Sequence, residues 1–357
     1  MIMLTLKGVT KQYLYGARLF GALDLTVADG EIVAVYGGEG SGKTSFLKTV
    51  AGVEDSEGEI LVCGESTKVK TDNVVMVFDD GCVFGFRSVF DNLAFPLKIR
   101  RVDKVEIASR VIRAAEKTGI GGCLRLRARS LSAEEQRRMS LARIFVRDAP
   151  LVLIDEPTKG LSKEEASAVW ADLAPLLKER AAAGASVIFS TTDRMEAMSI
   201  SDRVMVLQAG EVKQVASWEE IAARPSNVWA AQAIDVHYNV VKCVLYLKNG
   251  VLTLKFGDGK EIFVEGTDGK PLENYIGKEV LCGWFPSFSA TAKGIPARKA
   301  FSEKTVFCER TARGTEAHTE SGLYTLCPFG CDEVDAYPCD GEGVTLFDAT
   351  NENSIMR

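Results

Sequence analysis

Continuous apolar runs separated by amphipathic stretches dominate the first two thirds of this chain. Runs of this kind predict strands buried on both faces, and they lie at 31–36, 73–78, 151–154 and 187–190. Apolar positions with helical spacing lie between them, at 45–50, 89–94, 103–117 and 139–146. Strands that alternate with helices predict an α/β fold with a largely parallel sheet, which places its ligand at the carboxyl ends of the strands.

Two further patterns subdivide the chain. From about residue 80 to 145 the apolar positions are helical, and Ser88 is a suitable N-cap, so we expect a helical subdomain inserted in the α/β domain. Short strands between glycine-rich turns follow residue 235, at 246–256, 261–264, 280–283, 305–308 and 344–348. We therefore predict one domain over residues 1–235 and an all-β, barrel-like domain over 236–357.

A glycine-rich turn joins the strand at 31–36 to the helix after it. It matches the pattern G-x-x-x-x-G-K-[ST] in full, with Gly37, Gly38, Glu39, Gly40, Ser41, Gly42, Lys43 and Thr44. Glycine lets successive backbone N–H groups converge on an anion, and the helix from Ser45 directs the positive end of its dipole to the same point. Lys43 then reaches the β- and γ-phosphates, and Thr44 offers its hydroxyl to Mg²⁺. Because a strand and a helix flank the turn, we favour a nucleotide site over a chance match.

A pair of carboxylates follows the apolar run at 151–154. Asp155 and Glu156 stand where a strand of the same sheet ends, so they lie opposite the phosphate-binding turn. Asp155 is suited to hold Mg²⁺, directly or through water, and Glu156 is suited to orient the attacking water. The alternative, an acidic turn after a core strand, is disfavoured by the turn upstream.

Two tyrosines, Tyr13 and Tyr15, precede the phosphate-binding turn. Either ring is a suitable platform on which a purine base can stack, and Tyr13 is our candidate for that role. Packing of the same rings at a sheet edge explains them equally well, so both interpretations stay open.

Composition narrows the class of protein. Forty-three basic and forty-nine acidic residues give a net charge of −6, which disfavours a general nucleic-acid binder. The N-terminal segment lacks the pattern of a signal peptide, and no run approaches the about eighteen apolar residues of a membrane helix, so we expect a cytoplasmic chain. The short basic cluster of Arg125, Arg127 and Arg129 is interpreted as a solvated face rather than a contact with an acidic partner.

The nine cysteines of a cytoplasmic chain predict reduced, mostly buried thiols. Four of them suggest a second interpretation, because Cys308, Cys327, Cys331 and Cys339 lie near His318 and both residue types bind zinc. Their spacing lacks the C-x₂-C pairs of structural zinc sites, so thiols buried in a β domain are the simpler interpretation.

The order of the motifs resembles the nucleotide-binding subunit of an ABC transporter. The phosphate-binding turn is followed by the loop at 77–80, by Leu131-Ser132, by the strand that ends in Asp155 and Glu156, and by Thr192-Asp193. The segment at 223–227 and the C-terminal strands resemble the importers for maltose and related solutes. The resemblance implies a P-loop NTPase cassette with a parallel core sheet, an antiparallel β subdomain and a helical subdomain. An OB-like regulatory domain of the TOBE or MOP type is expected to follow.

The resemblance also implies how such a chain works. In that family two cassettes dimerise head to tail, and each ATP is held between one subunit's phosphate-binding turn and the other's Leu-Ser-Gly-Gly-Gln signature. Mg²⁺ is held by the equivalents of Thr44, Asp79 and Asp155. Two transmembrane permease subunits and an extracytoplasmic solute-binding protein complete the importer. We therefore expect a peripheral subunit on the cytoplasmic face of the inner membrane, with no nucleic acid as partner.

Several positions depart from the family pattern. The signature reads Ser132, Ala133, Glu134 and Glu135, so both glycines and the glutamine are replaced. Asp79 replaces the loop glutamine, Thr192 replaces the switch histidine, and Ser162 replaces the Asp that closes the loop after the catalytic Glu. A carboxylate such as Glu134, held about 4 Å from a phosphate charge, costs up to roughly 4 kcal/mol at an effective dielectric constant near 20. Loss of one preorganised donor, as at Thr192, slows catalysis by about a hundredfold to a thousandfold.

Lys43, Thr44, Asp155 and Glu156 remain, so the chain keeps the residues that bind Mg²⁺–ATP. A homodimer contains two doubly impaired sites, and we therefore predict a heterodimer with a second, intact cassette, in which hydrolysis at this chain's own site is impaired. The alternative is a regulatory or scaffold subunit that binds ATP without hydrolysing it. A soluble ATPase acting on nucleic acid is disfavoured by the acidic balance of charge.

Overall fold

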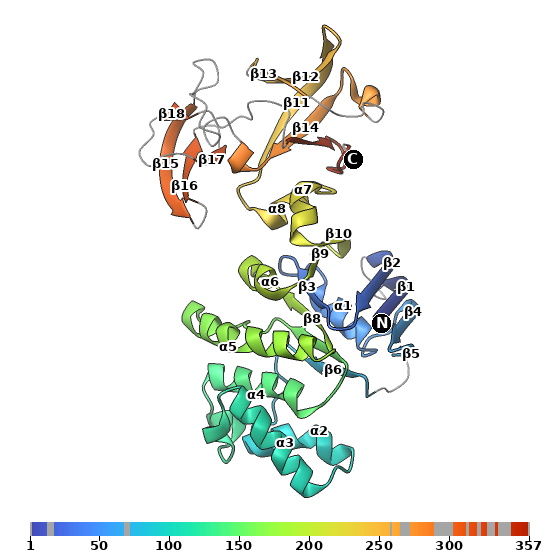
Figure 1. The fold of residues 1–357 in the computed structure, drawn as a ribbon, viewed down its shortest axis with the longest axis vertical. Coiled ribbons are helices and arrows are strands. Elements are labelled where there is room, and N and C mark those ends of the chain that lie inside the picture. Colours follow the sequence, from blue (N-terminus) through green and yellow to red (C-terminus); the bar gives the residue numbers. More distant parts are fainter. Residues whose placement is uncertain are drawn as a thin grey trace. The chain divides into compact units, whose positions relative to one another are not determined.

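A computed structural model of the protein describes residues 2–12, 18–67, 72–257, 259–264, 272–288, 303–311, 314–319, 323–326, 333–334 and 344–355. The chain divides into two compact units, Met1–Ser217 and Trp218–Arg357 (Figure 1). The division falls before residue 235, the end that the sequence pattern gives for the first domain. Two short helices account for the difference, because α7 (Trp218–Ala223) and α8 (Val228–Ile234) belong to the second unit. A hydrogen bond from the Val228 amide to the Glu352 carbonyl ties α8 there.

A six-stranded sheet in the order β10-β9-β3-β8-β7-β6 forms the centre of the first unit. Its strands are β3 (Ile32–Tyr36), β6 (Val74–Val77), β7 (Leu151–Asp155), β8 (Ser186–Thr191), β9 (Arg203–Gln208) and β10 (Glu211–Ala216). All neighbouring pairs are parallel except β9 with β10, as the predicted α/β fold requires. Every residue of β7 and β8 is buried, which explains the apolar runs at 151–154 and 187–189, and polar residues stand only at the strand ends.

A smaller antiparallel sheet in the order β2-β1-β4-β5 packs over the first helix. It consists of β1 (Ile2–Gln12), β2 (Arg18–Ala28), β4 (Glu57–Val62) and β5 (Glu65–Ser66). Residues of α1 (Lys43–Val50), of this sheet and of the larger sheet share one apolar core, among them Phe46, Leu6 and Val35. The helix that follows the phosphate-binding turn is therefore held from both sides.

The remaining helices of the first unit are α2 (Val89–Ile99), α3 (Lys104–Lys117), α4 (Ala133–Val146), α5 (Lys163–Ala182) and α6 (Arg194–Ile200), with short 3₁₀ turns at Gly121–Cys123 and Ala128–Ser130. The helices α2, α3 and α4 bury a core of their own, in which Leu93, Val111 and Met139 meet. Ser88 caps α2 by accepting from the Asp91 amide, as expected. The predicted helix at 139–146 begins earlier, at Ala133, because Ser132 starts α4 with a capping box that apolar spacing does not reveal.

The second unit contains a five-stranded antiparallel sheet in the order β13-β12-β11-β14-β19 and a further sheet in the order β17-β16-β15-β18. The strands are β11 (Asn239–Lys248), β12 (Val251–Phe256), β13 (Glu261–Phe263), β14 (Glu279–Trp284), β15 (Glu303–Thr311), β16 (Gly314–Thr319), β17 (Tyr324–Leu326), β18 (Glu333–Val334) and β19 (Val344–Asp348), with 3₁₀ turns at Glu273–Tyr275 and Pro286–Phe288. The segment predicted as strand at 246–256 is a hairpin. Asn249 and Gly250 form its turn with φ of 53° and 81°, a conformation that the Asn-Gly pair favours.

Among the described residues, no helix has both the length and the apolar character that crossing a membrane requires.

Candidate functional site

A cavity of about 810 Å³ opens where β3, β7 and β8 end. Its lining includes Glu39, Gly40, Ser41, Gly42, Lys43, Thr44, Ser45, Glu156, Thr158, Lys159, Gly160, Lys163, Thr191, Thr192 and Asp193. The structure thus brings the phosphate-binding turn, Glu156 and Thr192 together around one cavity. These segments are far apart in the chain, and only the parallel sheet unites them.

Steric limits explain why glycines form the turn. A Cβ atom on Gly37 would lie 2.1 Å from the carbonyl oxygen of Leu207, so no larger residue fits. Gly42 has φ of 103°, in the left-handed region, and a Cβ there would meet the Leu19 side chain at 2.5 Å. The turn therefore depends on glycine at both positions.

Lys43 lies at the bottom of the cavity and is nearly buried. Its Nζ donates to the carbonyl oxygens of Gly37 at 2.8 Å and Gly38 at 2.9 Å, and lies 3.0 Å from Oε1 of Glu156. Glu156 is itself held in the left-handed region, with φ of 46°. A phosphate group that enters the cavity must replace these partners of the ammonium group.

Asp155 ends β7 next to Glu156, and it is fully buried and does not itself line the cavity. Its Oδ1 accepts a hydrogen bond of 2.6 Å from the Ser190 hydroxyl, but Oδ2 is buried and has no hydrogen-bond partner. Burial raises the pKa of the Asp155 carboxyl, although the hydroxyls of Ser190 and Thr44 lower it in part. A carboxylate oxygen without a donor beside a hydroxyl suits Mg²⁺, which takes few protein ligands and completes its shell with phosphate and water. The residues present therefore fit the metal that the sequence motif implies.

Two polar groups that sequence reasoning missed fix this region. Ser190 donates to Asp155 and accepts a 3.0 Å hydrogen bond from the Glu156 amide, so one hydroxyl orients both carboxylate residues. Glu196 is buried and accepts from the hydroxyls of Thr158 at 2.5 Å and Thr191 at 2.6 Å. Burial raises the pKa of the Glu196 carboxyl. In the sequence, the signal for these groups was the hydroxyl residues Ser190 and Thr191 at the end of the buried strand β8.

Asp79 lies outside the cavity lining, in the loop after β6. Its Oδ2 lies 2.8 Å from Nζ of Lys159, and this hydrogen bond lowers the pKa of the Asp79 carboxyl. The Arg137 guanidinium donates to the backbone carbonyl oxygens of both residues, at 2.7 Å to Asp79 and 2.9 Å to Lys159. Neither Lys159 nor Arg137 was a candidate from the sequence.

The signature segment does not line the cavity of its own chain. The Ser132 hydroxyl accepts from the Glu135 amide at 3.1 Å, while Oε2 of Glu135 accepts from the Ser132 amide at 2.8 Å. This backbone hydrogen bond lowers the pKa of the Glu135 carboxyl. Glu134 turns toward Arg138, 2.8 Å away. A carboxylate therefore occupies the N-terminus of α4, which is a natural position for an anion.

Some candidates lie outside the residues that the structure describes, namely Tyr13, Tyr15, Cys327, Cys331 and Cys339. Of Cys308 and His318, only the backbone pairing within β15 and β16 is described. Within the described ranges, no group of three or more His, Cys, Asp or Glu side chains is arranged to hold a metal ion. The zinc interpretation gains no support from this part of the chain.

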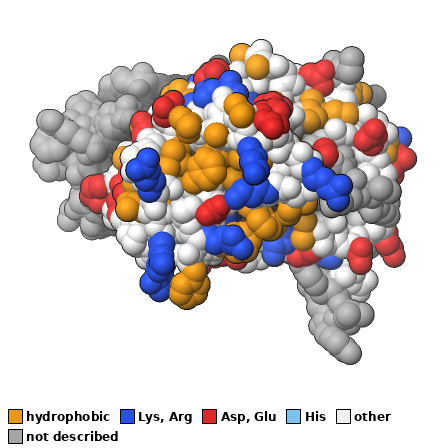
Figure 2. Space-filling view, turned by 90° about the horizontal axis from the view of Figure 1, so that it is seen from below, with side chains coloured by type: hydrophobic (Ala, Val, Ile, Leu, Met, Phe, Trp, Pro, Cys, Tyr) orange, Lys and Arg blue, Asp and Glu red, His pale blue; other side chains and the backbone are white. Residues whose placement is uncertain are grey.

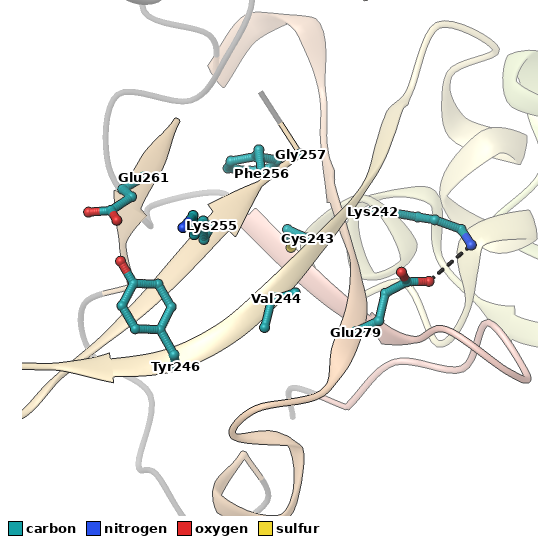
Figure 3. A pocket seen from close by; sticks show the side chains of 9 residues that line it. All are labelled: Lys242, Cys243, Val244, Tyr246, Lys255, Phe256, Gly257, Glu261 and Glu279. Carbon is teal, nitrogen blue, oxygen red and sulfur yellow. Dashed lines mark ion pairs between the residues drawn. The ribbon is translucent and has the colours of Figure 1, made fainter. Parts of the chain in front are cut away.

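A second cavity, of about 640 Å³, lies on the second unit, against β11, β12, β13 and β14 (Figure 3). Lys242 and Glu279 point toward one another there and form an ion pair of 2.9 Å. Glu261 pairs with Lys248 and also faces the Tyr246 hydroxyl. Most of the charged groups around this cavity are thus engaged with one another, and we assign no chemistry to it.

The fold and the first cavity together define a P-loop NTPase. A profile of the ABC transporter family matches residues 20–159. An uncharacterized ABC transporter ATP-binding protein of Bacillus subtilis, YurJ, is 31% identical over 80% of this chain and 78% of its own length. The chain therefore belongs to the ABC transporter ATP-binding proteins.

Further relatives differ in how much of them is matched. The sn-glycerol-3-phosphate import ATP-binding protein UgpC of Vibrio cholerae is 32% identical over 65% of this chain, and this match spans 63% of UgpC, less than two thirds of its length. The sulfoquinovosyl glycerol transport ATP-binding protein SmoE of Agrobacterium fabrum is 28% identical over 96% of both chains. The solved structure of CbiO1 from Clostridium perfringens, part of an ABC transporter complex, covers 63% of this chain with a TM-score of 0.54 at 22% identity, which supports the fold alone.

Proposed function

We propose that this chain is the ATP-binding subunit of an ABC importer and that it pairs with a second cassette whose motifs are intact. The observation that carries the proposal is the cavity that joins Lys43, Thr44 and Glu156 beside the unpartnered oxygen of Asp155. These are the groups that hold a triphosphate, bind Mg²⁺ and orient water. Thr192 lines the same cavity but is short and uncharged, so hydrolysis here is expected to be slow.

The state of the signature segment supports the pairing. In a cassette dimer this segment closes over the partner's nucleotide, and Ser132 together with the N-terminus of α4 should contact the γ-phosphate. Here Oε2 of Glu135 already accepts from the Ser132 amide, and the Ser132 hydroxyl accepts from the Glu135 amide. A γ-phosphate must displace an ionised carboxylate from the same position. Two copies of this chain are therefore expected to bind each other's nucleotide weakly.

The solute class rests on the relatives. UgpC is named for import of sn-glycerol-3-phosphate and SmoE for transport of sulfoquinovosyl glycerol. Both solutes are polyhydroxy compounds, so we propose a sugar or related solute for this importer. The second unit corresponds in this proposal to the regulatory TOBE-type domain. Two transmembrane permease subunits and an extracytoplasmic solute-binding protein complete the proposed assembly, in which this chain lies at the cytoplasmic face of the membrane.

Replacing Glu156 distinguishes the proposed importer subunit from the alternative, a scaffold subunit that binds nucleotide without hydrolysing it. In the complete importer, Glu156→Gln is expected to lower solute uptake at least tenfold, the order of magnitude of an oriented general base working in an already impaired site. Nucleotide binding should persist, because Gln keeps the shape of the side chain. Glu164→Gln, an exposed carboxylate in the first turn of α5, is the matched control. Uptake that Glu156→Gln leaves unchanged favours the scaffold.

The permease is expected to dock on the helical subdomain. Figure 2 views the molecule from the end at which α2 and α3 lie in Figure 1, and hydrophobic side chains gather on this face among Lys and Arg side chains. Residues 80–145 contain 14 basic and 7 acidic residues, although the whole chain carries −6. Phe86 is 79% exposed, and the Arg129 guanidinium lies 5.0 Å from the centre of its ring. An exposed aromatic ring beside an arginine, on a subdomain with an excess of basic residues, suits a partner segment with apolar and acidic side chains.

Phe86→Asp is expected to reduce uptake at least tenfold while nucleotide affinity stays within about twofold of normal, because a buried carboxylate beside an apolar partner costs more than 1.4 kcal/mol. Val105→Asp tests an equally exposed apolar residue elsewhere in the subdomain, since Val105 is 78% exposed at the start of α3. Co-purification of the permease with each variant gives the direct measurement. Normal uptake and normal co-purification with Phe86→Asp would refute this docking site.

A further inference from the structure

An ion pair joins the loops after β6 and β7 beside the proposed catalytic centre. Asp79 and Lys159 are 2.8 Å apart at Oδ2 and Nζ, with side chains 30% and 53% exposed, so water reaches the pair. Asp79 replaces an uncharged glutamine of the family pattern, and Lys159 lines the cavity itself. The added negative charge of one loop is thus matched by a cation in the other.

Arg137 holds the two loops together from α4. Its Nη2 bridges the carbonyl oxygens of Asp79 and Lys159, while its Nη1 is buried and has no hydrogen-bond partner. The carboxylates of Asp79 and Asp155 both act on this guanidinium. Arg137 binds the backbone carbonyl oxygens of the two loops and not their side chains. The side chains of Asp79 and Lys159 can therefore change partners while the loops stay together.

Asp79 also lies within electrostatic reach of the metal-binding carboxylate. Its charge acts on Asp155, whose free Oδ2 marks the expected position of Mg²⁺. A carboxylate is a stronger Mg²⁺ ligand than the amide that the family places in this loop. Two cations, the Lys159 ammonium and the metal, can therefore bind the Asp79 carboxylate.

We propose that Lys159 competes with Mg²⁺ for the Asp79 carboxylate. This inference rests on the proposed function, because it assumes that Mg²⁺–nucleotide enters the first cavity. The structure shows the carboxylate held by Lys159; Asp79 would instead serve as a ligand to Mg²⁺ bound with a nucleotide, and Lys159 would then lose this partner. The Arg137 guanidinium keeps both backbones in place and balances the carboxylates throughout. Asp79 and Lys159 are thus one metal-responsive unit, in which Lys159 is a positioning residue.

The exchange is tested by the Mg²⁺ dependence of nucleotide binding to the purified chain, with a fluorescent, non-hydrolysable ATP analogue as the probe. Lys159→Met is expected to lower the half-saturating Mg²⁺ concentration about threefold to fivefold, the range that an exposed ion pair can supply. Asp79→Asn should raise it by a similar or larger factor. Lys163→Met is the matched control, because Lys163 lines the same cavity and makes no ion pair among the described residues. It should shift the concentration by less than about twofold.

A double variant separates the ion pair from a general effect of charge. If Lys159 acts through Asp79, Lys159→Met changes nothing once Asp79→Asn is present. Equal shifts for Lys159→Met and Lys163→Met, or a Lys159→Met shift that persists in the double variant, would overturn the inference while leaving the proposed function intact. Failure of the unaltered chain to bind the analogue at any Mg²⁺ concentration would instead refute the proposed function.

Discussion

The purified chain alone is expected to bind Mg²⁺–ATP and yet to release phosphate about a hundredfold to a thousandfold more slowly than the same chain mixed with its intact partner cassette. Two defects combine in the lone chain. Thr192, which lines the cavity, is uncharged, and Glu135 holds its carboxylate against the Ser132 amide, where the proposal places the γ-phosphate bound by a second copy. Phosphate release measured at matched total cassette concentration, together with nucleotide binding, checks this result.

A second variant separates the effect of Thr192 from that of the signature segment. Thr192→His in the lone chain restores the missing switch residue but leaves the signature segment occupied, so it should recover only part of the rate. Rapid hydrolysis by the unaltered chain as a homodimer would contradict the pairing proposal. Absence of nucleotide binding would contradict the site itself.

The second large effect is expected from rebuilding the signature. The triple substitution Ala133→Gly, Glu134→Gly and Glu135→Gln removes both carboxylates, including the negative charge that Glu135 holds against the Ser132 amide at the start of α4. In the heterodimer this should raise hydrolysis at the partner's phosphate-binding turn at least tenfold. The reason is that a like charge near the γ-phosphate opposes closure by up to roughly 4 kcal/mol. Single-turnover hydrolysis by the paired cassettes gives the measurement.

Gln at position 135 can still complete the capping box, but each of the two new glycines weakens α4 itself, by about 1 kcal/mol per position. The chain provides a matched control, because α5 begins with the same arrangement of Ser162 and Glu165. Glu165→Gln should lower the melting temperature about as much as Glu135→Gln and leave hydrolysis at the partner's site unchanged. A rebuilt signature that fails to accelerate that site would show that these carboxylates do not govern closure.

Much of the first unit could be predicted because its physics is local. A strand buried on both faces is apolar along most of its length, as β7 and β8 are between their polar end residues, and a phosphate-binding turn must contain glycine where a Cβ meets backbone, as at Gly37. Glu156 could be placed opposite that turn because parallel strands end at one edge of a sheet, whereas Thr192 was assigned through the resemblance to the ABC transporter family.

The features that the sequence did not predict depend on contacts between distant segments, which no local pattern encodes. Lys159 and Arg137 are ordinary charged residues in the sequence. Their contacts with Asp79 form only when folding brings the loop after β7 and the helix α4 next to it. The early start of α4 was missed because its first turn is polar and is held by a capping box. The hairpin turn at Asn249-Gly250 did carry a local signal, and the prediction of strand across it was wrong.

The left-handed backbone at Glu156 has a thermodynamic consequence. A residue with a side chain in that conformation is destabilised by about 1–3 kcal/mol relative to relaxed backbone, and glycine there would relieve most of it. The folded chain therefore stores conformational strain at a carboxylate that pairs with the P-loop ammonium. In the proposed importer, this strain belongs to the residue that would orient the attacking water, whereas a scaffold that only binds nucleotide has no use for it.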